Sequence, residues 1–170
     1  MSNTLNVAPA LKNPGQLYPF SAEIFVEPTE VFGEAVCFAP ARLEGSAMGA
    51  GESVKLRGSL TGEAVMHCAR CLCEVRIPIR VDVDETFSRA ASPDEPDRYP
   101  FEGSELDLTD CAHDLLVLEL PIRAVCSEGC KGLCPACGAN RNLNSCTCLE
   151  GGVANPFSAL KAMVENDEEV

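Results

Sequence analysis

Six cysteines gathered in one short segment near the C-terminus constrain this chain most strongly. The segment has few large apolar residues, so it cannot fold by burying hydrocarbon and needs a covalent or metal crosslink. The redox compartment decides between these, because disulfides persist in oxidising compartments whereas thiols stay free to bind metals in reducing ones. The chain starts without a basic residue followed by an apolar run, so we expect no secretory signal and a cytoplasmic protein. The sequence therefore predicts a metal site, most simply for Zn²⁺, whose candidate ligands are Cys126, Cys130, Cys134, Cys137, Cys146 and Cys148.

Cys134 and Cys137 have the spacing of a zinc knuckle, in which two intervening residues allow both sulfurs to reach one ion. Gly138 follows them and permits the positive φ with which such a loop turns back. We expect one closed zinc site with a structural role, because the candidate ligands are all cysteines. Its second half could come from either remaining pair, or from one cysteine of each: Cys126 with Cys130, and Cys146 with Cys148.

A second C-x-x-C pair, Cys68 and Cys71, lies between two stretches that are predicted to be strands, and Cys73 follows closely. Three interpretations are open. The pair could complete a metal site together with spare C-terminal cysteines. It could be a redox pair, although that chemistry favours a cysteine at a helix N-terminus, and here strands flank the pair. It could also be a thiol pair that only packs within a turn.

Two long stretches with a period of two residues, 54–66 and 75–87, are the clearest structural signal. Apolar and polar side chains alternate in both, which predicts strands with one buried face in an antiparallel sheet. Pro78 indicates a sheet edge or a bulge, and Gly58 and Gly62 indicate bulges, bends or a turn. A helix is predicted over residues 108–118. We therefore expect an α+β fold: a mainly antiparallel β-sheet domain with one or two short helices and a C-terminal cysteine-rich zinc module.

Turn and charge signals between the periodic stretches divide the chain into four expected parts. These are a loose N-terminal segment at 1–16, the β-rich domain at 17–121, the zinc module at 122–150, and a short helix with an acidic tail at 151–170. Within the β-rich domain we expect further strands at 17–27 and 31–38, a loop at 39–51 and an acidic linker at 88–105. The C-terminal helix is expected to begin at Asn155 and Pro156.

Charge narrows the expected partners. The chain has 26 acidic and 13 basic residues, a formal net charge of −13. This disfavours a broad phosphate-binding surface, because nucleic-acid affinity comes largely from Lys and Arg. No apolar run approaches membrane-spanning length. No nucleophile–base pair or carboxylate cluster stands out on a scaffold that could tune it, so we expect neither enzymatic activity nor a small-molecule substrate.

Several of these motifs together resemble one protein family. The order is C-A-R-C-L after one strand, an alternating strand, an acidic gap, L-D-L-T at a helix start, and E-L-P-I after it. C-x3-C-K-G-L-C-P-x-C-G-x-N-x-N and a closing C-x-C then follow. This arrangement, over roughly residues 54–160, is similar to the YceD family of bacterial and plastid proteins associated with accumulation of large-subunit ribosomal RNA. The C-terminal cysteines are a feature of some branches of that family. The resemblance implies a role in ribosome biogenesis, with large-subunit (23S) rRNA as the species affected.

Three hypotheses describe how such a protein would act. The first is an acidic, zinc-stabilised assembly factor that engages basic ribosomal proteins or large-subunit assembly intermediates. The second is a zinc-knuckle module that contacts rRNA directly, for which Arg123, Lys131 and Arg141 are the candidate contacts. The third is an enzyme, either a thiol oxidoreductase or a nuclease. The acidic balance of the chain favours the first.

Overall fold

The computed structural model describes residues 3–89 and 98–148. It divides into two compact units, each of which is described by itself below. The sheet unit comprises the described residues up to His67 and those from Glu74 to Ala124. The cysteine unit comprises the segment Cys68–Cys73 and the described residues from Val125 to Cys148. The cysteine-rich part of the chain thus includes the predicted turn around Cys68, which the sequence analysis had placed inside the β-rich domain.

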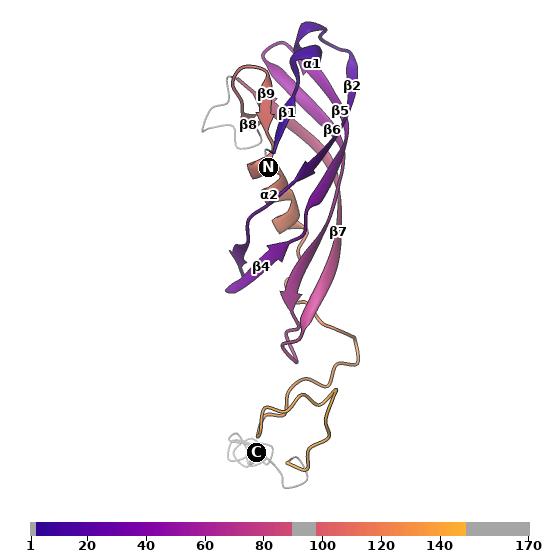
Figure 1. Cartoon of the computed structure of the whole chain (residues 1–170), viewed down its shortest axis with the longest axis vertical. Coiled ribbons are helices and arrows are strands. Elements are labelled where there is room, and N and C mark those ends of the chain that lie inside the picture. Colours follow the sequence, from indigo (N-terminus) through magenta and orange to yellow (C-terminus); the bar gives the residue numbers. More distant parts are fainter. Residues whose placement is uncertain (1–2, 90–97, 149–170) are drawn as a thin grey trace, which may run out of the picture. The chain divides into compact units, whose positions relative to one another are not determined.

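The sheet unit is built mainly of antiparallel strands, with two short helices. The order along the main sheet is β2-β5-β6-β4-β3, with β7 paired to β6 and β8 paired to β7, and β1 pairs with β9 separately. Every strand pair is antiparallel except β7 with β8. The elements in chain order are β1 (Thr4–Asn6), α1 (Ala8–Lys12), β2 (Leu17–Ile24), β3 (Thr29–Val31), β4 (Glu34–Phe38), β5 (Ala41–Ala50), β6 (Ser53–His67), β7 (Glu74–Ser88), β8 (Arg98–Pro100), β9 (Glu105–Asp107) and α2 (Thr109–Leu118). The predicted α+β class with a mainly antiparallel sheet is confirmed (Figure 1).

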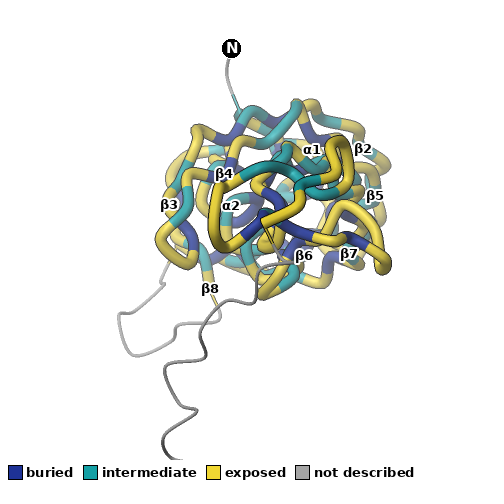
Figure 2. Tube along the Cα trace, turned by 90° about the horizontal axis from the view of Figure 1, so that it is seen from below, coloured by how far each residue is buried: buried dark blue, intermediate teal, exposed yellow. Residues whose placement is uncertain are grey.

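The two predicted alternating strands form one long hairpin, β6 and β7, paired from His67 opposite Glu74 to Ser53 opposite Ser88. More buried and less buried positions alternate along much of it, and the burial colours change accordingly along the tube in Figure 2. Pro78 lies on a sheet edge, as expected, because the other described partner of β7, β8, pairs only at Thr86–Ser88. The buried apolar side chains of the hairpin are Val54, Leu56, Leu60, Ala64, Met66, Ile79, Val83 and Phe87.

Gly58 does not form the predicted bulge or bend. It lies in register opposite Gly45 of β5, and the pairing continues on both sides. A Cβ atom on Gly58 would lie 2.0 Å from the Glu44 carbonyl oxygen, and one on Gly45 would lie 2.1 Å from that of Arg57. The two glycines therefore allow a close approach of two backbones within a continuous ladder.

Two predicted irregular segments are regular in the structure, and their packing explains both. Residues 39–51, predicted as a loop, contain the central strand β5. Residues 1–16, predicted as loose, contain β1 and α1, where Ala10 is fully buried. A Cβ atom on Gly49 of β5 would lie 2.3 Å from the Ala10 carbonyl oxygen. Gly49, one of the small residues that suggested a loop, thus allows α1 to pack directly on the sheet.

Of the other predicted segments, one is described in full and two lie partly or wholly outside the described residues. Residues 31–38 form part of a hairpin, β3 and β4, whose turn at Phe32 and Gly33 has positive φ at both positions. The expected acidic linker, 88–105, begins at the last residue of β7, contains β8 and ends at the first residue of β9, and its residues 90–97 lie outside the described part. The expected C-terminal helix and acidic tail also lie outside it.

Helix α2 matches the predicted helix and covers one face of the sheet (Figure 1). The Asp107 carboxylate accepts hydrogen bonds from the Thr109 backbone N–H (2.9 Å) and hydroxyl (2.6 Å) at the helix start. Leu116 is buried and would lie 3.5 Å from a Cβ atom placed on Gly62 of β6, so small residues also admit this helix. Among the described residues, no helix is long and apolar enough to cross a membrane.

Neighbouring positions on β7 should respond oppositely to substitution. Ile79 is only 3% exposed, so Ile79→Asp buries a carboxylate without a partner and should cost about 3 kcal/mol or more of unfolding free energy. Arg80 is exposed, so Arg80→Ala should change it by no more than about 0.5 kcal/mol. Urea unfolding followed by circular dichroism measures both, and equal tolerance at the two positions would refute the alternation.

Candidate metal centre

The cysteine unit contains two groups of four cysteines that could each hold a metal ion, and within each group all sulfurs lie within 4.8 Å of one another. The groups contain neither histidine nor carboxylate. Five of the six predicted ligands thus fall into two groups, where one site was expected, and Cys130 belongs to neither group. The first group is Cys68, Cys71, Cys73 and Cys126, and the second is Cys134, Cys137, Cys146 and Cys148.

The first group has a fifth thiol beside it. The sulfur of Cys130 lies 3.8 Å from that of Cys68, and Cys130 is only 6% exposed. Within the group, the Cys71 sulfur lies 3.6 Å from that of Cys126 and 3.3 Å from that of Cys73. The predicted pair Cys68 and Cys71 is therefore close to the two cysteines that begin the C-terminal segment, as one of the three open interpretations proposed.

Each group begins with the same turn. The N–H of Leu72 donates to the Cys68 carbonyl at 2.9 Å, and the N–H of Gly138 donates to the Cys134 carbonyl at 2.8 Å. The residue after each C-x-x-C pair has positive φ, +73° at Gly138 and +59° at Leu72. Gly138 behaves as the sequence predicted. Leu72 takes the same conformation with a side chain that disfavours it, so the turn is imposed on it by its surroundings.

Backbone N–H groups stabilise a thiolate in each group. The N–H groups of Cys126, Arg70 and Cys71 lower the pKa of Cys68 to about 6. Those of Cys137 and Ala136 lower the pKa of Cys134 to about 6. A thiolate is the form of cysteine that binds metal, so both turns are set up to present one.

One further thiol in each group has a raised pKa because of a neighbouring cysteine. The pKa of Cys126 is raised to about 11, first by the Cys130 side chain, and that of Cys148 is raised to about 11, first by the Cys137 side chain. Sulfurs this close cannot all lose their protons without a positive charge among them. A bound metal ion supplies that charge, so the donor set fits a thiolate-preferring ion such as Zn²⁺.

Asn142 joins the two groups' segments and was missed by sequence reasoning. Its side-chain oxygen accepts the Lys131 N–H at 2.8 Å, and its side-chain nitrogen donates to the Cys130 sulfur at 3.3 Å and to the Asn140 side-chain oxygen at 2.9 Å. The N-x-N pattern at 140–142, after the Cys134 and Cys137 pair, was the available signal, since asparagine side chains often form hydrogen bonds with backbone groups in loops.

Arg70 is a second residue whose role the sequence did not reveal. Its guanidinium donates to the carbonyls of Glu128 and Cys130, both at 3.1 Å, and its own carbonyl accepts the Leu133 N–H at 3.1 Å. A Cβ atom on Gly132 would lie 3.0 Å from that carbonyl. Arg70 thereby fixes the 68–73 turn to the segment that starts at residue 125.

Two further titratable residues, His67 and Cys111, belong to the sheet unit and not to the cysteine groups. The His67 ring lies 2.8 Å from the Glu34 carboxylate, within the sheet unit. Cys111 is buried in α2, where burial first, and the nearby Glu85 and Asp114 carboxylates next, raise the pKa of its thiol to about 12.

Relief of strain at Leu72 should strengthen metal binding. Leu72 is 63% exposed, so Leu72→Gly loses little buried surface while removing the unfavourable positive φ. We expect Zn²⁺ affinity, measured by chelator competition, to rise about two- to fivefold. Leu143→Gly is the matched control, because Leu143 is also exposed but has no positive φ, and it should bring no gain. Weaker binding by Leu72→Gly would contradict the comparison of the two turns.

Comparison with known proteins places these features in a family. Residues 56–164, well over half of the chain, match the family described as "Large ribosomal RNA subunit accumulation protein YceD". An uncharacterized protein of Mycobacterium tuberculosis is 37% identical over 95 residues, 51% of this chain and 44% of that protein. The uncharacterized protein YlbN of Bacillus subtilis is 25% identical over 160 residues, which cover 92% of this chain and 93% of YlbN.

A plant relative carries the functional name. The "Large ribosomal RNA subunit accumulation protein YCED homolog 1, chloroplastic" of Arabidopsis thaliana is 44% identical over 50 residues, 29% of this chain and 16% of that protein. The chain thus spans less than half the length of the mycobacterial and plant relatives named here. No solved structure matches it significantly. Since the family match runs from strand β6 into the cysteine unit, the chain belongs to the YceD family, which is described by the name of a large ribosomal RNA subunit accumulation protein.

Proposed function

We propose that this protein is a non-enzymatic ribosome biogenesis factor that supports accumulation of large-subunit (23S) rRNA. The observation that carries the proposal is the family match, which includes the β6–β7 hairpin and both C-x-x-C turns. A thiol oxidoreductase is the less favoured alternative. Its reactive cysteine gains from a helix N-terminus, and Cys68 lies instead in a turn between β6 and β7.

We propose that the factor meets the assembling particle through protein contacts. The described part of the sheet unit has 17 acidic residues and 9 basic ones, and further acidic residues lie in the undescribed segments. Such a surface repels a phosphate backbone and attracts the Lys- and Arg-rich proteins that bind it. Basic ribosomal proteins, or large-subunit assembly intermediates that contain them, are the partners that this charge favours.

We further propose that both cysteine groups bind structural Zn²⁺, which requires reduced thiols and so a cytoplasmic setting. In the second group the four ligands are Cys134, Cys137, Cys146 and Cys148. Each site would be closed by four sulfurs, leaving no open position for a reacting water, so the metal's role is to hold the fold.

The first site has five thiols for four positions, and sulfur spacing favours Cys130 over Cys73. Four sulfurs about 2.3 Å from one Zn²⁺ in a tetrahedron lie about 3.8 Å apart. The Cys68–Cys130 distance of 3.8 Å and the Cys71–Cys126 distance of 3.6 Å fit two opposite edges of that tetrahedron. The Cys71–Cys73 distance of 3.3 Å is shorter than such an edge. Cys130 also accepts a hydrogen bond from Asn142, as metal-bound thiolates commonly do.

Native mass spectrometry of single cysteine variants tests this assignment. The parent chain should carry two Zn²⁺ ions. Cys130→Ser should lower the occupancy of the first site and Cys134→Ser that of the second, whereas Cys73→Ser should retain both ions. Removal of one of four ligands weakens a structural site strongly. In the presence of a mild chelator, Cys73→Ser should therefore still carry more Zn²⁺ than Cys130→Ser or Cys134→Ser. Loss of an ion from Cys73→Ser with retention in Cys130→Ser would reverse the choice of ligand.

Depletion of the protein in cells tests the family role. Mature large-subunit rRNA should fall relative to small-subunit rRNA, and re-expression of the parent chain should restore the ratio. Crosslinking in the restored cells should yield basic protein partners, and their recovery should weaken as salt rises, because exposed charges are screened within about 10 Å at 0.1 M ionic strength. An unchanged rRNA ratio would refute the role, and absence of basic protein adducts would refute the proposed contacts.

A further inference from the structure

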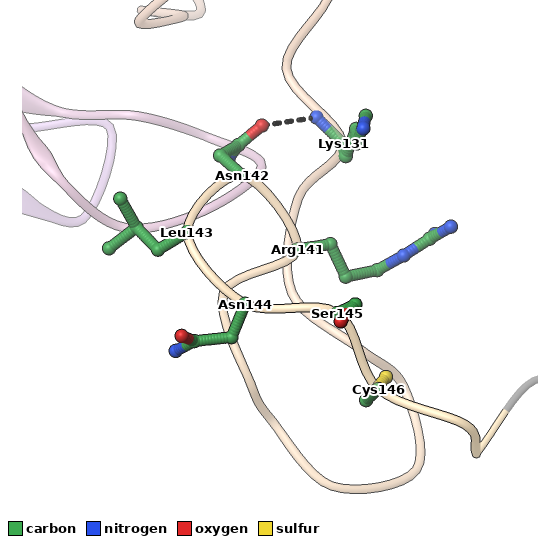
Figure 3. Close-up of a pocket in the computed structure, with 7 residues that line it drawn as sticks. All are labelled: Lys131, Arg141, Asn142, Leu143, Asn144, Ser145 and Cys146. Carbon is green, nitrogen blue, oxygen red and sulfur yellow. Dashed lines mark hydrogen bonds between the residues drawn. The ribbon is translucent and has the colours of Figure 1, made fainter.

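We propose that a pocket on the cysteine unit binds the phosphate backbone of an RNA strand, with Lys131 and Arg141 as its contacts. The choice of RNA as the source of phosphate rests on the proposed function, while the anion chemistry rests on the pocket itself. The pocket has a volume of about 440 Å³ and is lined by Lys131 and residues 141–146 (Figure 3).

The lining of this pocket differs from the character of the whole chain. Two cations line it and no acidic residue does, although acidic residues outnumber basic ones two to one overall. Asn144 and Ser145 add neutral hydrogen-bonding groups. The lining therefore suits an anion that accepts several hydrogen bonds, and a phosphate diester is such an anion.

The charge of the cysteine unit points the same way. Its described residues include three basic side chains, Arg70, Lys131 and Arg141, and one acidic side chain, Glu128. Arg70 is already engaged with the carbonyls of Glu128 and Cys130. Among the described residues of this unit, Lys131 and Arg141 are therefore the two basic side chains whose charged groups form no hydrogen bond within the unit itself, and both line the pocket.

Short backbone contacts hold the two cations near each other, although ten positions separate them in the sequence. The Arg141 N–H donates to the Gly132 carbonyl at 3.0 Å, and Leu133 forms an antiparallel bridge with Asn140. Asn142 fixes the Lys131 N–H at 2.8 Å. Both backbone positions are set before any ligand arrives, which lowers the entropic cost of binding. The sequence analysis saw these residues only as isolated candidates.

Arg141 is the better suited of the two for a directional contact. Its side chain extends from the loop on the side where Lys131 and Ser145 also lie (Figure 3). A planar guanidinium can donate two parallel hydrogen bonds to one phosphate, and an ammonium acts as a point charge beside it. Two cations spaced along a loop can serve two successive phosphates of one strand.

The competing explanation is that these cations only offset the charge of the thiolates. A Zn²⁺ ion with four thiolates carries a formal charge of about −2. Lys131 adjoins Cys130, and Cys146 lines the same pocket. On that explanation, removal of the two cations would weaken metal binding. It would lower RNA affinity only as much as removal of two cations elsewhere in the chain. The two explanations therefore predict different measurements.

Fluorescence anisotropy of the full zinc-loaded chain with a labelled single-stranded RNA of mixed sequence tests the proposal. The double variant Lys131→Ala/Arg141→Ala should bind about tenfold more weakly or worse at low salt. The magnitude of the slope of log affinity against log salt should fall by about 1.4, because each phosphate contact on a single strand contributes about 0.7. The matched control is Lys12→Ala/Arg80→Ala, which removes two exposed cations from the sheet unit and should change affinity less than twofold.

Three further measurements make the result decisive. Native mass spectrometry should show two Zn²⁺ ions in the double variant, and the charge-preserving variant Lys131→Arg/Arg141→Lys should regain most RNA affinity. Photo-crosslinked RNA on the parent chain should map to residues 131–146, which tests the site even if the double variant loses metal. Inorganic phosphate should compete only at concentrations far above the RNA.

The proposal is overturned if Lys131→Ala/Arg141→Ala and the control Lys12→Ala/Arg80→Ala lose RNA affinity equally. It is also overturned if crosslinks map outside the pocket, or if inorganic phosphate competes as strongly as the RNA. If Lys131→Ala/Arg141→Ala loses Zn²⁺, and if the RNA crosslinks of the parent chain map outside 131–146, the two cations only offset the charge of the thiolates. Because none of these results depends on rRNA levels in cells, they can fail while the proposed role in rRNA accumulation stands.

Discussion

Sulfur atoms that lie less than 4 Å apart are the constraint on which the cysteine unit depends. Cys68 with Cys130, and Cys71 with Cys126, meet at distances that two thiolates tolerate only with a cation between them. The unit has little apolar surface to bury instead, since its buried side chains are mainly its cysteines. If an ion binds as proposed, the backbone turns and asparagine contacts around these thiols would form together with metal binding.

The sheet unit is instead stabilised by burial of apolar side chains. Phe87, Leu56 and Leu60 are fully buried, and their burial provides the apolar surface that the cysteine unit lacks. Close packing rather than coordination sets its details, as the facing pair Gly45 and Gly58 shows. Loss of metal should consequently leave this sheet intact, because none of the residues in the two cysteine groups belongs to its core.

The features that the sequence predicted are those governed by local chemistry. Alternation revealed β6 and β7, and the C-x-x-C-G pattern revealed the positive φ of Gly138. Strand β5 was missed because its glycines serve partners that a local pattern does not reveal: Gly45 allows the close approach of β6, and Gly49 allows that of α1. The grouping of cysteines was open for a similar reason: Cys126 is placed beside Cys71 by the Arg70 contacts, which no spacing rule contains. Long-range packing thus decided what local patterns left undetermined.

The distribution of charge suggests how one small factor can address a particle made of both protein and RNA. The described part of the sheet unit has nearly twice as many acidic as basic side chains, whereas that of the cysteine unit has three basic and one acidic. A uniformly acidic protein would be repelled by rRNA wherever it approached, and a uniformly basic one would bind any RNA in the cell. If Lys131 and Arg141 bind the RNA backbone as proposed, they would permit a local contact, while the acidic residues of the sheet unit would disfavour nonspecific RNA binding. On this view Lys131 and Arg141 would contribute orientation more than affinity, since two phosphate contacts alone bind weakly and protein contacts elsewhere must supply the rest.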